Sequence, residues 1–282
     1  MTVQSTNFTA GPAMLPVLFV SHGAPLFAIE PGVTGPALTS WGQGLRLPEA
    51  GLRGIVLMSP HWTAAKPAVM TNPAPETWHD FGGFPAALYA LNYPASGGPA
   101  LAAEVLALLA EAGINAAGDA QRPLDHGAWV PLMHLFPDAR VPVVQVALPI
   151  DAGPAEVLAL GRALRSLRER GVLVVGSGSM THNLSEFFGG ARQPAPYVAE
   201  FSRWVESAIE RGDKPALLDY RRQAPHAERA HPSEDHFLPL FFALGAAGWS
   251  VEAEGGSQPI KADYLSREVM YGILAMDSFA LA

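Results

Sequence analysis

The sequence predicts an α/β protein with one domain, in which a central, mostly parallel or mixed sheet is flanked by helices on both sides. Short runs rich in valine and isoleucine alternate with segments of helical periodicity, which is the pattern of α/β folds. The runs are continuously apolar, as in sheets covered on both faces. The chain has 282 residues, and single α/β domains often reach roughly 250. Because no shift in composition marks a boundary, we expect one domain over residues 1–282.

Four strands and four helices are predicted from these patterns. The helix over residues 99–112 is typical, with a proline at its start and Gly113 at its end. Two long segments, 66–96 and 212–231, fit neither pattern, and long irregular segments inside a compact domain are usually functional or disordered. The predicted strands cover residues 17–20, 54–58, 141–148 and 172–175, and the predicted helices cover 99–112, 155–170, 196–211 and 233–247.

Composition excludes several classes of protein. Apolar residues make up 49% of the chain and charged residues 16%, which argues against disorder. The net charge is −8 and no basic cluster stands out, so we expect no nucleic-acid partner. The absence of cysteine excludes disulfides and thiolate metal sites. We find no signal peptide at the start and no apolar run long enough for a bilayer, so we expect no membrane association and a cytoplasmic location.

Three of the nine histidines follow predicted strands. His22 comes directly after the first strand, His61 directly after the second, and His182 shortly after the fourth. In open α/β sheets, ligands bind beyond the carboxyl ends of the strands. If these strands are parallel, the three imidazoles meet at one edge of the sheet, where they could hold a divalent metal. A site of nitrogen and oxygen ligands suits zinc or non-haem ferrous iron.

Other histidines support this site less directly. His236 precedes a strongly apolar helix, for which Ser233 is a plausible N-cap. His126 lies before a helix, and Asp125 could either orient it or cap that helix. His79 lies among aromatic residues and glycines, which form either an apolar pocket or a packed loop. His231 is expected in a solvated loop, and structural or surface roles are expected for His134 and His226.

Alternative motifs are weak. The glycines of residues 176–179 lack the third glycine and the spacing of a dinucleotide fingerprint, and no P-loop lysine motif occurs. The Gly-x-Ser-x-Gly pattern of serine hydrolases is absent, although Ser177 or Ser179 lies close enough in sequence to His182 to keep that reading open.

The chain resembles the class III extradiol ring-cleavage dioxygenases, in particular the branch of the 4,5-DOPA extradiol dioxygenases. Each matching segment alone would be a weak signal, but together they occur in order over almost the whole chain. The segments are residues 21–25 (SHGAP), 59–62 (SPHW), 79–85 (HDFGGFP), 93–95 (YPA), 124–129 (LDHGAW), 176–178 (GSG) with 182–183 (HN), and 234–240 (EDHFLPL).

The resemblance implies roles for individual residues. His22, His61 and His236 match the metal ligands of the family, although Glu234 or Asp235 could take the place of His236 as the third ligand. His182 matches the acid/base histidine. His126 matches a second catalytic histidine of the family, which contacts substrate or dioxygen. We also expect His79 and Tyr264 to bind the substrate, and Tyr89 is a further candidate for such a contact.

The implied activity is extradiol cleavage of a catechol, DOPA or a relative, with dioxygen to give a muconic semialdehyde-type acid. Fe(II) is the expected cofactor, and Zn(II) could occupy the same ligands without redox activity. Two other classes remain open from the residues. Three histidines also describe a zinc-dependent hydrolase, and a metal-binding interaction protein would keep the fold without turnover. The oligomeric state is left open.

Overall fold

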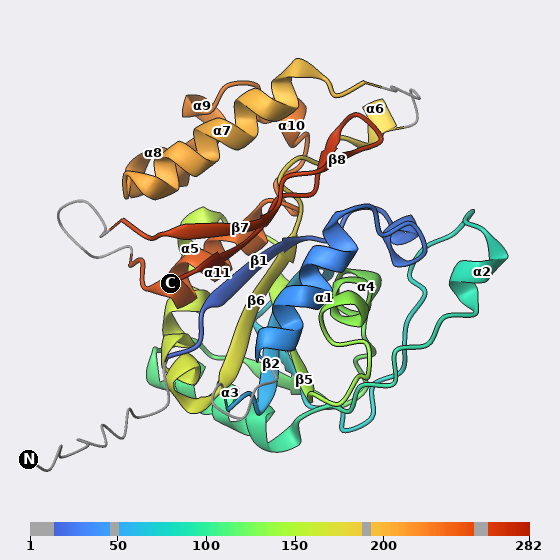
Figure 1. Ribbon diagram of the computed structural model, residues 1–282. Helices are drawn as coiled ribbons and strands as arrows, with labels where there is room; N and C mark the ends of the chain where they lie inside the picture. The colour runs from blue at the N-terminus through green and yellow to red at the C-terminus, as the bar shows by residue number, and fades with distance from the viewer. Residues whose placement is uncertain (1–13, 46–50, 188–192, 251–258) are drawn as a thin grey trace, which may run out of the picture.

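The central feature of the computed structural model is one eight-stranded sheet (Figure 1). The structure describes residues 14–45, 51–187, 193–250 and 259–282. The strand order is β4-β3-β5-β2-β6-β1-β10-β7. These strands are β1 (Val17–Ser21), β2 (Gly54–Ala64), β3 (Ala68–Met70), β4 (Ala117–Asp119), β5 (Val143–Pro149), β6 (Val172–Gly178), β7 (Ala262–Ser266) and β10 (Ser278–Leu281); β8 (Val269–Met270) and β9 (Leu274–Ala275) form a separate hairpin.

The middle of the sheet is parallel and its margins are mixed. β5, β2, β6 and β1 pair in parallel, with Leu18 opposite Val175 and Val56 opposite Val174. β3 and β10 are antiparallel to their neighbours β5 and β1. The four parallel strands therefore end at the same edge, as the sequence predicts.

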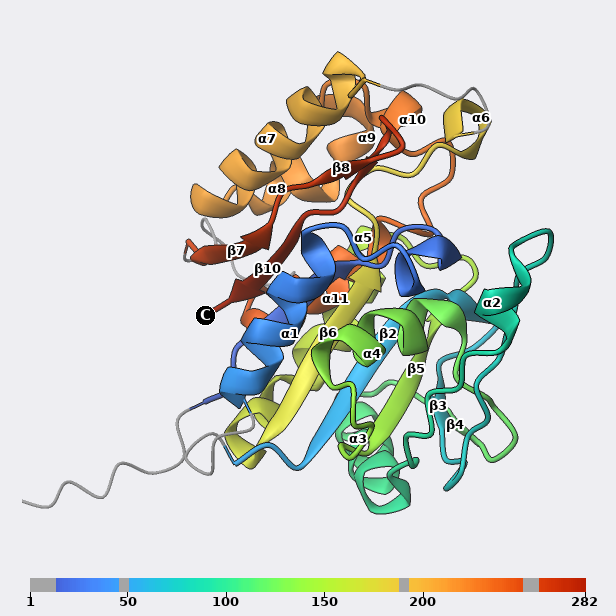
Figure 2. The same cartoon turned by 45° about the vertical axis from the view of Figure 1, so that its right-hand side comes forward.

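Helices cover both faces of the sheet, as Figures 1 and 2 show from two directions. One face packs against α3, α5 and α11, and the other packs against α1, α4 and the short η1. Further helices, α7 to α10, lie beyond the β7 margin of the sheet (Figure 2). The bounds are η1 (Pro25–Ala28), α1 (Thr34–Leu45), α2 (Ala86–Tyr89), α3 (Pro99–Glu111), α4 (His126–Leu135), α5 (Pro154–Ala163), η3 (Arg165–Arg170), α6 (Leu184–Phe187), α7 (Pro196–Glu210), α8 (Lys214–Leu218), α9 (Tyr220–Gln223), α10 (Ala227–Ala230) and α11 (Leu238–Ala247).

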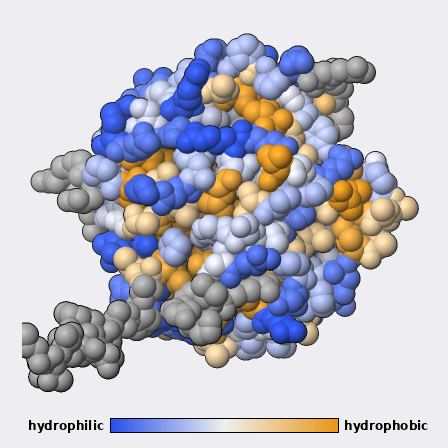
Figure 3. Space-filling model, in the orientation of Figure 1, coloured by the Kyte–Doolittle hydropathy of each residue, from blue (hydrophilic) through white to orange (hydrophobic). Residues whose placement is uncertain are grey.

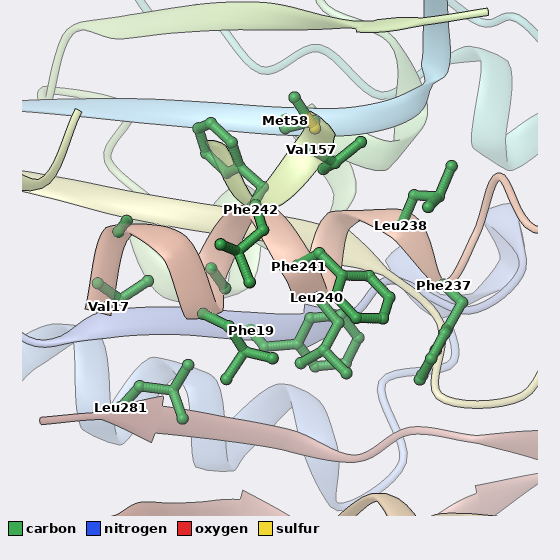
Figure 4. Close-up of a cluster of buried hydrophobic side chains, with 14 of the residues drawn as sticks. Val17, Phe19, Met58, Val157, Phe237, Leu238, Leu240, Phe241, Phe242 and Leu281 are labelled. Carbon is green, nitrogen blue, oxygen red and sulfur yellow. The ribbon is translucent and has the colours of Figure 1, made fainter. Parts of the chain in front are cut away.

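Alternate residues of each central strand belong to opposite cores. Val17 and Phe19 pack with α11, whereas Leu18 and Val20 belong to the cluster beneath α1 and α4. Figure 4 shows the first core, where Phe242 and other side chains of α11 lie over β1 and β2. Because both faces are buried, both sets of positions must be apolar, which explains the continuous apolar runs.

The predicted elements are confirmed in the middle of the sheet, but their bounds differ. The second strand extends from Gly54 to Ala64, with a register shift between Ser59 and Thr63. The predicted helix 155–170 is α5 followed by the 3₁₀ turn η3. The predicted helix 233–247 begins only at Leu238, so Ser233 is not its N-cap. Pro239 explains this, because proline lacks an N–H and is tolerated only in the first helical turn.

The two segments expected to be irregular contain short elements. β3 and α2 lie within residues 66–96, and α8, α9 and α10 lie within 212–231. Helices of four or five residues are too short to show a helical period in the sequence.

On the molecular face seen in Figure 3, hydrophobic side chains form separate patches among hydrophilic ones. None of the described helices is long and apolar enough to cross a membrane.

Candidate active site

The predicted convergence of histidines occurs at the carboxyl edge of the parallel strands. His22 follows β1, and His61 lies in the last part of β2, beyond the start of the register shift. The Nε2 atoms of His22 and His61 lie 3.1 Å apart. His126, the first residue of α4, places its ring centroid 3.9 Å from that of His61 and 5.6 Å from that of His22.

Two more histidines complete the cluster. The ring centroid of His236 lies 5.0 Å from that of His61 and 5.5 Å from that of His22. His182, which follows β6, stacks on His236 with a centroid separation of 3.5 Å and an interplanar angle of 4°. Thus all five histidines that the sequence assigns to the metal or to catalysis lie together. The tightest trio, with nitrogen atoms within 4.8 Å of one another, is His22, His61 and His126.

Hydrogen bonds fix the tautomers of three of these rings. The Ser177 hydroxyl donates to the Gly127 carbonyl, so it must accept from Nδ1 of His22, 3.0 Å away. An ionised carboxylate can only accept hydrogen bonds. Nδ1–H of His126 therefore donates to Asp80 at 2.9 Å, and Nδ1–H of His236 donates to Asp235 at 2.5 Å. In all three rings Nε2 is left with its lone pair, as a metal ligand requires.

Burial keeps the imidazoles neutral. It is the main cause that lowers the pKa of His61 and that of His182, each to about 4, and it lowers the pKa of His22 and His236 well below 6.5. Repulsion between neighbouring rings adds to this effect for His22, His61 and His236. Burial disfavours the charged form of Asp80, but the hydrogen bonds from His126 and the electrostatic attraction of His126 and His61 together outweigh this effect and lower the pKa of the carboxyl. At neutral pH these four histidines therefore present unprotonated nitrogens.

Two glycines allow the site to form by close approach of backbone segments. A Cβ atom on Gly178 would lie 2.4 Å from the carbonyl oxygen of His236. The turn that carries His236 can therefore lie directly on β6, where the N–H of Ser179 donates to the same carbonyl at 2.8 Å. A Cβ on Gly127 would lie 2.2 Å from Ser59 Oγ and 2.8 Å from Cδ2 of His61. The start of α4 thus reaches β2 only because residue 127 is glycine.

Asp125 caps α4 rather than orienting His126. Its side chain accepts from the N–H of Ala128 at 3.2 Å and also from Ser59 and Gln145. Arg122 donates to Asp125 at 2.7 Å and to the His61 carbonyl at 3.1 Å. This buried network ties the start of α4 to the end of β2, and so holds His126 beside His61.

A cavity of about 240 Å³ opens over the cluster. His61, His126, His182 and His236 are exposed to it, and most of the remaining wall is apolar. The larger apolar side chains of the wall are Pro25, Phe81, Phe84, Leu184, Phe187 and Leu274.

The structure places the other predicted residues outside the cavity wall. His79 lies behind it, with Nε2 3.1 Å from the Leu91 carbonyl and its ring 5.7 Å from that of Phe81. Tyr264 lies on β7, where Arg267 stacks on its ring 3.5 Å from the centroid and Phe279 lies 4.8 Å away. Neither residue is brought to the cluster.

The expectation for His231 is wrong, whereas those for His134 and His226 agree with the structure. His231 is fully buried, and its Nε2 lies 2.9 Å from the Met180 carbonyl. The expectation failed because the His231 ring packs against Phe201 of α7, which is far from it in the sequence, and against Phe237, which precedes the next helix, with ring centroids 5.4 and 4.9 Å away. His134 bonds the Phe27 carbonyl, and exposed His226 bonds Glu200.

Sequence reasoning assigned no role to Asp80, the carboxylate that orients His126. Its position in the HDFGGFP segment, directly after His79, was the available signal, but nothing in the sequence connects that segment to residue 126. The apolar wall from α6 was also missed, because its four residues show no period.

The cluster fits a divalent metal ion by the chemistry of its donors. Several neutral imidazoles lie close together, and three carry a fixed Nε2 lone pair. Ligating histidines in metal sites commonly donate their other N–H to a carboxylate, a carbonyl or a hydroxyl group, as here. Imidazole suits iron and zinc alike, so the donor set indicates a metal without selecting one.

The family comparison decides the class of protein. Residues 16–272 match the family described as the catalytic LigB subunit of aromatic ring-opening dioxygenase. The chain belongs to this family. It is therefore an extradiol-type, metal-dependent ring-opening dioxygenase, an oxidoreductase, and the hydrolase and binding-protein alternatives are set aside.

Relatives of this family support the assignment over most of the chain. A 4,5-DOPA dioxygenase extradiol of Beta vulgaris is 39% identical over 240 residues, which cover 84% of this chain and 88% of the relative. One from Escherichia coli K12 is 34% identical over 253 residues, covering 87% and 88%. The crystal structure of an uncharacterized protein from Escherichia coli K12 superposes with a TM-score of 0.73 at 27% identity, covering 95% of this chain and 99% of that one.

Proposed function

We propose that this dioxygenase cleaves the ring of a catechol next to its two hydroxyl groups, to give a muconic semialdehyde-type acid. The observation that carries the proposal is the cluster of five histidines, four of which line the floor of an apolar cavity. The names of the relatives make DOPA the first compound to test.

We assign the metal to His22, His61 and His236, and substrate contacts to His126 and His182. The first two belong both to the tightest trio and to the motif-based set, and His236 matches the motif while lying against both rings. When bound, a ferrous ion supplies electron transfer between the electron-rich catechol ring and dioxygen. Zinc on the same ligands would lack this capacity.

The chain's own residues supply proton transfer and shielding from water. His182 faces the cavity as a neutral imidazole, so it can accept a proton from a catechol hydroxyl and return it later in the reaction. His126, held through Nδ1 by Asp80, presents Nε2 to the same space. Phe81, whose ring lies 5.7 Å from that of His126, closes the cavity on that side.

The test is anaerobic reconstitution with Fe(II), followed by admission of air with DOPA and a panel of simple catechols. We expect oxygen uptake matched one-to-one by a yellow ring-opened product, and neither with the Zn(II)-loaded protein. Protein with a full complement of iron that consumes no oxygen with any catechol would contradict the proposal.

A further inference from the structure

The wall of the cavity beyond the histidines is formed by two apolar segments. Phe81 and Phe84 come from the irregular segment before α2, and their ring centroids lie 5.4 Å apart. Leu184 and Phe187 come from α6. A catechol whose two oxygens face the imidazoles would therefore direct its remaining ring carbons, and any substituent on them, toward this apolar wall.

Charged side chains that are adjacent in sequence to residues of the wall have partners elsewhere. Asp80 and Asp235 accept from His126 and His236. Next to Phe187 lies Tyr271, with ring centroids 5.1 Å apart, and its hydroxyl donates to Glu30 at 2.8 Å.

On α6, Glu186 forms a two-point ion pair with Arg229. No lysine, arginine or carboxylate of the described residues lines the cavity.

We propose that the natural substrate is a catechol with an uncharged, apolar substituent, rather than an amino acid or an aromatic acid. This rests on the proposed function and names the substrate class of the same site. Apolar groups gain free energy in proportion to the apolar surface that they bury. A carboxylate or ammonium group loses hydration there and meets no partner of opposite charge among the described residues. Phe84, Leu184 and Phe187 are the residues that set this preference.

The experiment compares four catechols that carry one substituent each at the same ring position. They are 4-propylcatechol, dopamine, 3-(3,4-dihydroxyphenyl)propionate and DOPA. We expect kcat/KM of the Fe(II) enzyme to be at least tenfold higher for 4-propylcatechol than for each charged compound. Equal or higher kcat/KM for any charged compound would overturn the inference.

A binding measurement separates this inference from the proposed function. Anaerobic calorimetry with the Zn(II)-loaded protein gives the dissociation constants of the same four compounds without turnover. Tightest binding of 4-propylcatechol to the Zn(II)-loaded protein, together with no ring opening of any catechol by the Fe(II)-loaded protein, would support the apolar preference and contradict the dioxygenase reaction. Ring opening by the Fe(II)-loaded protein, together with tightest binding of DOPA, would support the dioxygenase reaction and overturn the apolar preference.

A positive charge placed on the wall should shift the substrate preference toward a catechol with a carboxylate. Leu184 is 52% exposed, so Leu184→Arg is expected to fold. In Leu184→Arg, the ratio of kcat/KM for the propionate to that for 4-propylcatechol should rise at least tenfold. The matched variant Leu184→Gln, which is polar but uncharged, should leave this ratio within about threefold of the original. An unchanged ratio in Leu184→Arg would overturn the assignment of α6 to the substituent.

Discussion

Asp80 holds His126 twice: one oxygen, Oδ1, accepts from both the backbone N–H and Nδ1 of His126, each at 2.9 Å. The other oxygen, Oδ2, lies 3.9 Å from Nδ1 of His61. One carboxylate from an irregular segment thus faces two imidazoles of the cluster, which come from different elements of the fold.

Replacing Asp80 should weaken metal binding without unfolding the protein. Asp80→Ala removes the charge that lies 3.9 Å from Nδ1 of the ligand His61, as well as the acceptor for His126. Loss of a partner of a ligating histidine typically costs 10–100-fold in metal affinity, and because only His61 of these two residues is assigned to the metal we expect a loss of about tenfold. Asp80→Asn keeps an acceptor and should lose less. Competition with a chelator measures the Zn(II) affinity, and Asp263→Asn, at an exposed position of β7, is the control. Unchanged affinity in Asp80→Ala would show that the carboxylate does not support a ligand.

His182 should be separable from the metal ligands. His182→Ala is expected to keep its metal but lose ring opening by roughly 10²–10⁴-fold, the usual contribution of a general acid–base group. His22→Ala and His61→Ala should lose the metal itself. Metal analysis of the three purified variants, together with oxygen uptake, makes the comparison. Equal metal loss in all three would make His182 a ligand.

The third ligand can be identified by one pair of variants. We expect His236→Ala to lose metal and His126→Ala to retain it while losing turnover. Both rings have an Nδ1–H bound to a carboxylate, so the two substitutions leave similar vacancies and are well matched. Metal stoichiometry is the measurement. The reverse result would assign the metal to the tightest trio, His22, His61 and His126.

Gly127 should tolerate no side chain. The Cβ of Gly127→Ala would lie 2.2 Å from Ser59 Oγ, so α4 or β2 must shift. Such overpacking typically costs about 1–3 kcal/mol in the free energy of unfolding. Gly44→Ala in α1 is the control. No atom lies within 4 Å of where the new Cβ would be, and alanine stabilises a helix by roughly 0.5–1 kcal/mol relative to glycine. Denaturant unfolding measures both, and equal stability of the two variants would contradict the close approach.

The sequence could predict the parts of the fold that have a period or a repeated context. The four parallel strands were found because burial on both faces makes them continuously apolar, and the histidines at their ends followed from the rule for parallel sheets. The start of α11 was missed because the apolar pattern and the acidic residues 234–235 suggested a longer helix, whereas Pro239 fixes the first turn.

The margins and the supporting contacts of the site could not be predicted. β7 and β10 are short. β7 pairs with β10, and the pairing of β10 with β1 joins segments more than 200 residues apart. The bond between Asp80 and His126 likewise depends on a loop conformation that leaves no pattern in the sequence. No motif around Tyr264 marks it as a substrate contact, and its position beside Arg267 follows from the same unpredicted strand.

His231 gives a pH dependence that can be measured apart from the metal ligands. Its Nε2 donates to the Met180 carbonyl, and its buried Nδ1 has no partner among the described residues. Burial is the main cause that lowers the pKa of His231 to about 3. The unfolded chain therefore binds a proton at this residue near pH 6.5, whereas the folded protein does so only near pH 3.

Neutral His231 therefore makes its full contribution to the free energy of unfolding above pH 6.5. This contribution is lost as the pH falls toward 3. Between about pH 6 and 4 this residue should add a slope of about 1.4 kcal/mol per pH unit to the free energy of unfolding, which rises with pH. In metal-free protein, His231→Gln keeps a donor for Met180 but no titrating group, so its slope should be smaller by that amount. Urea unfolding at several pH values measures both slopes, and parallel lines would mean that His231 titrates alike in the folded and unfolded chain.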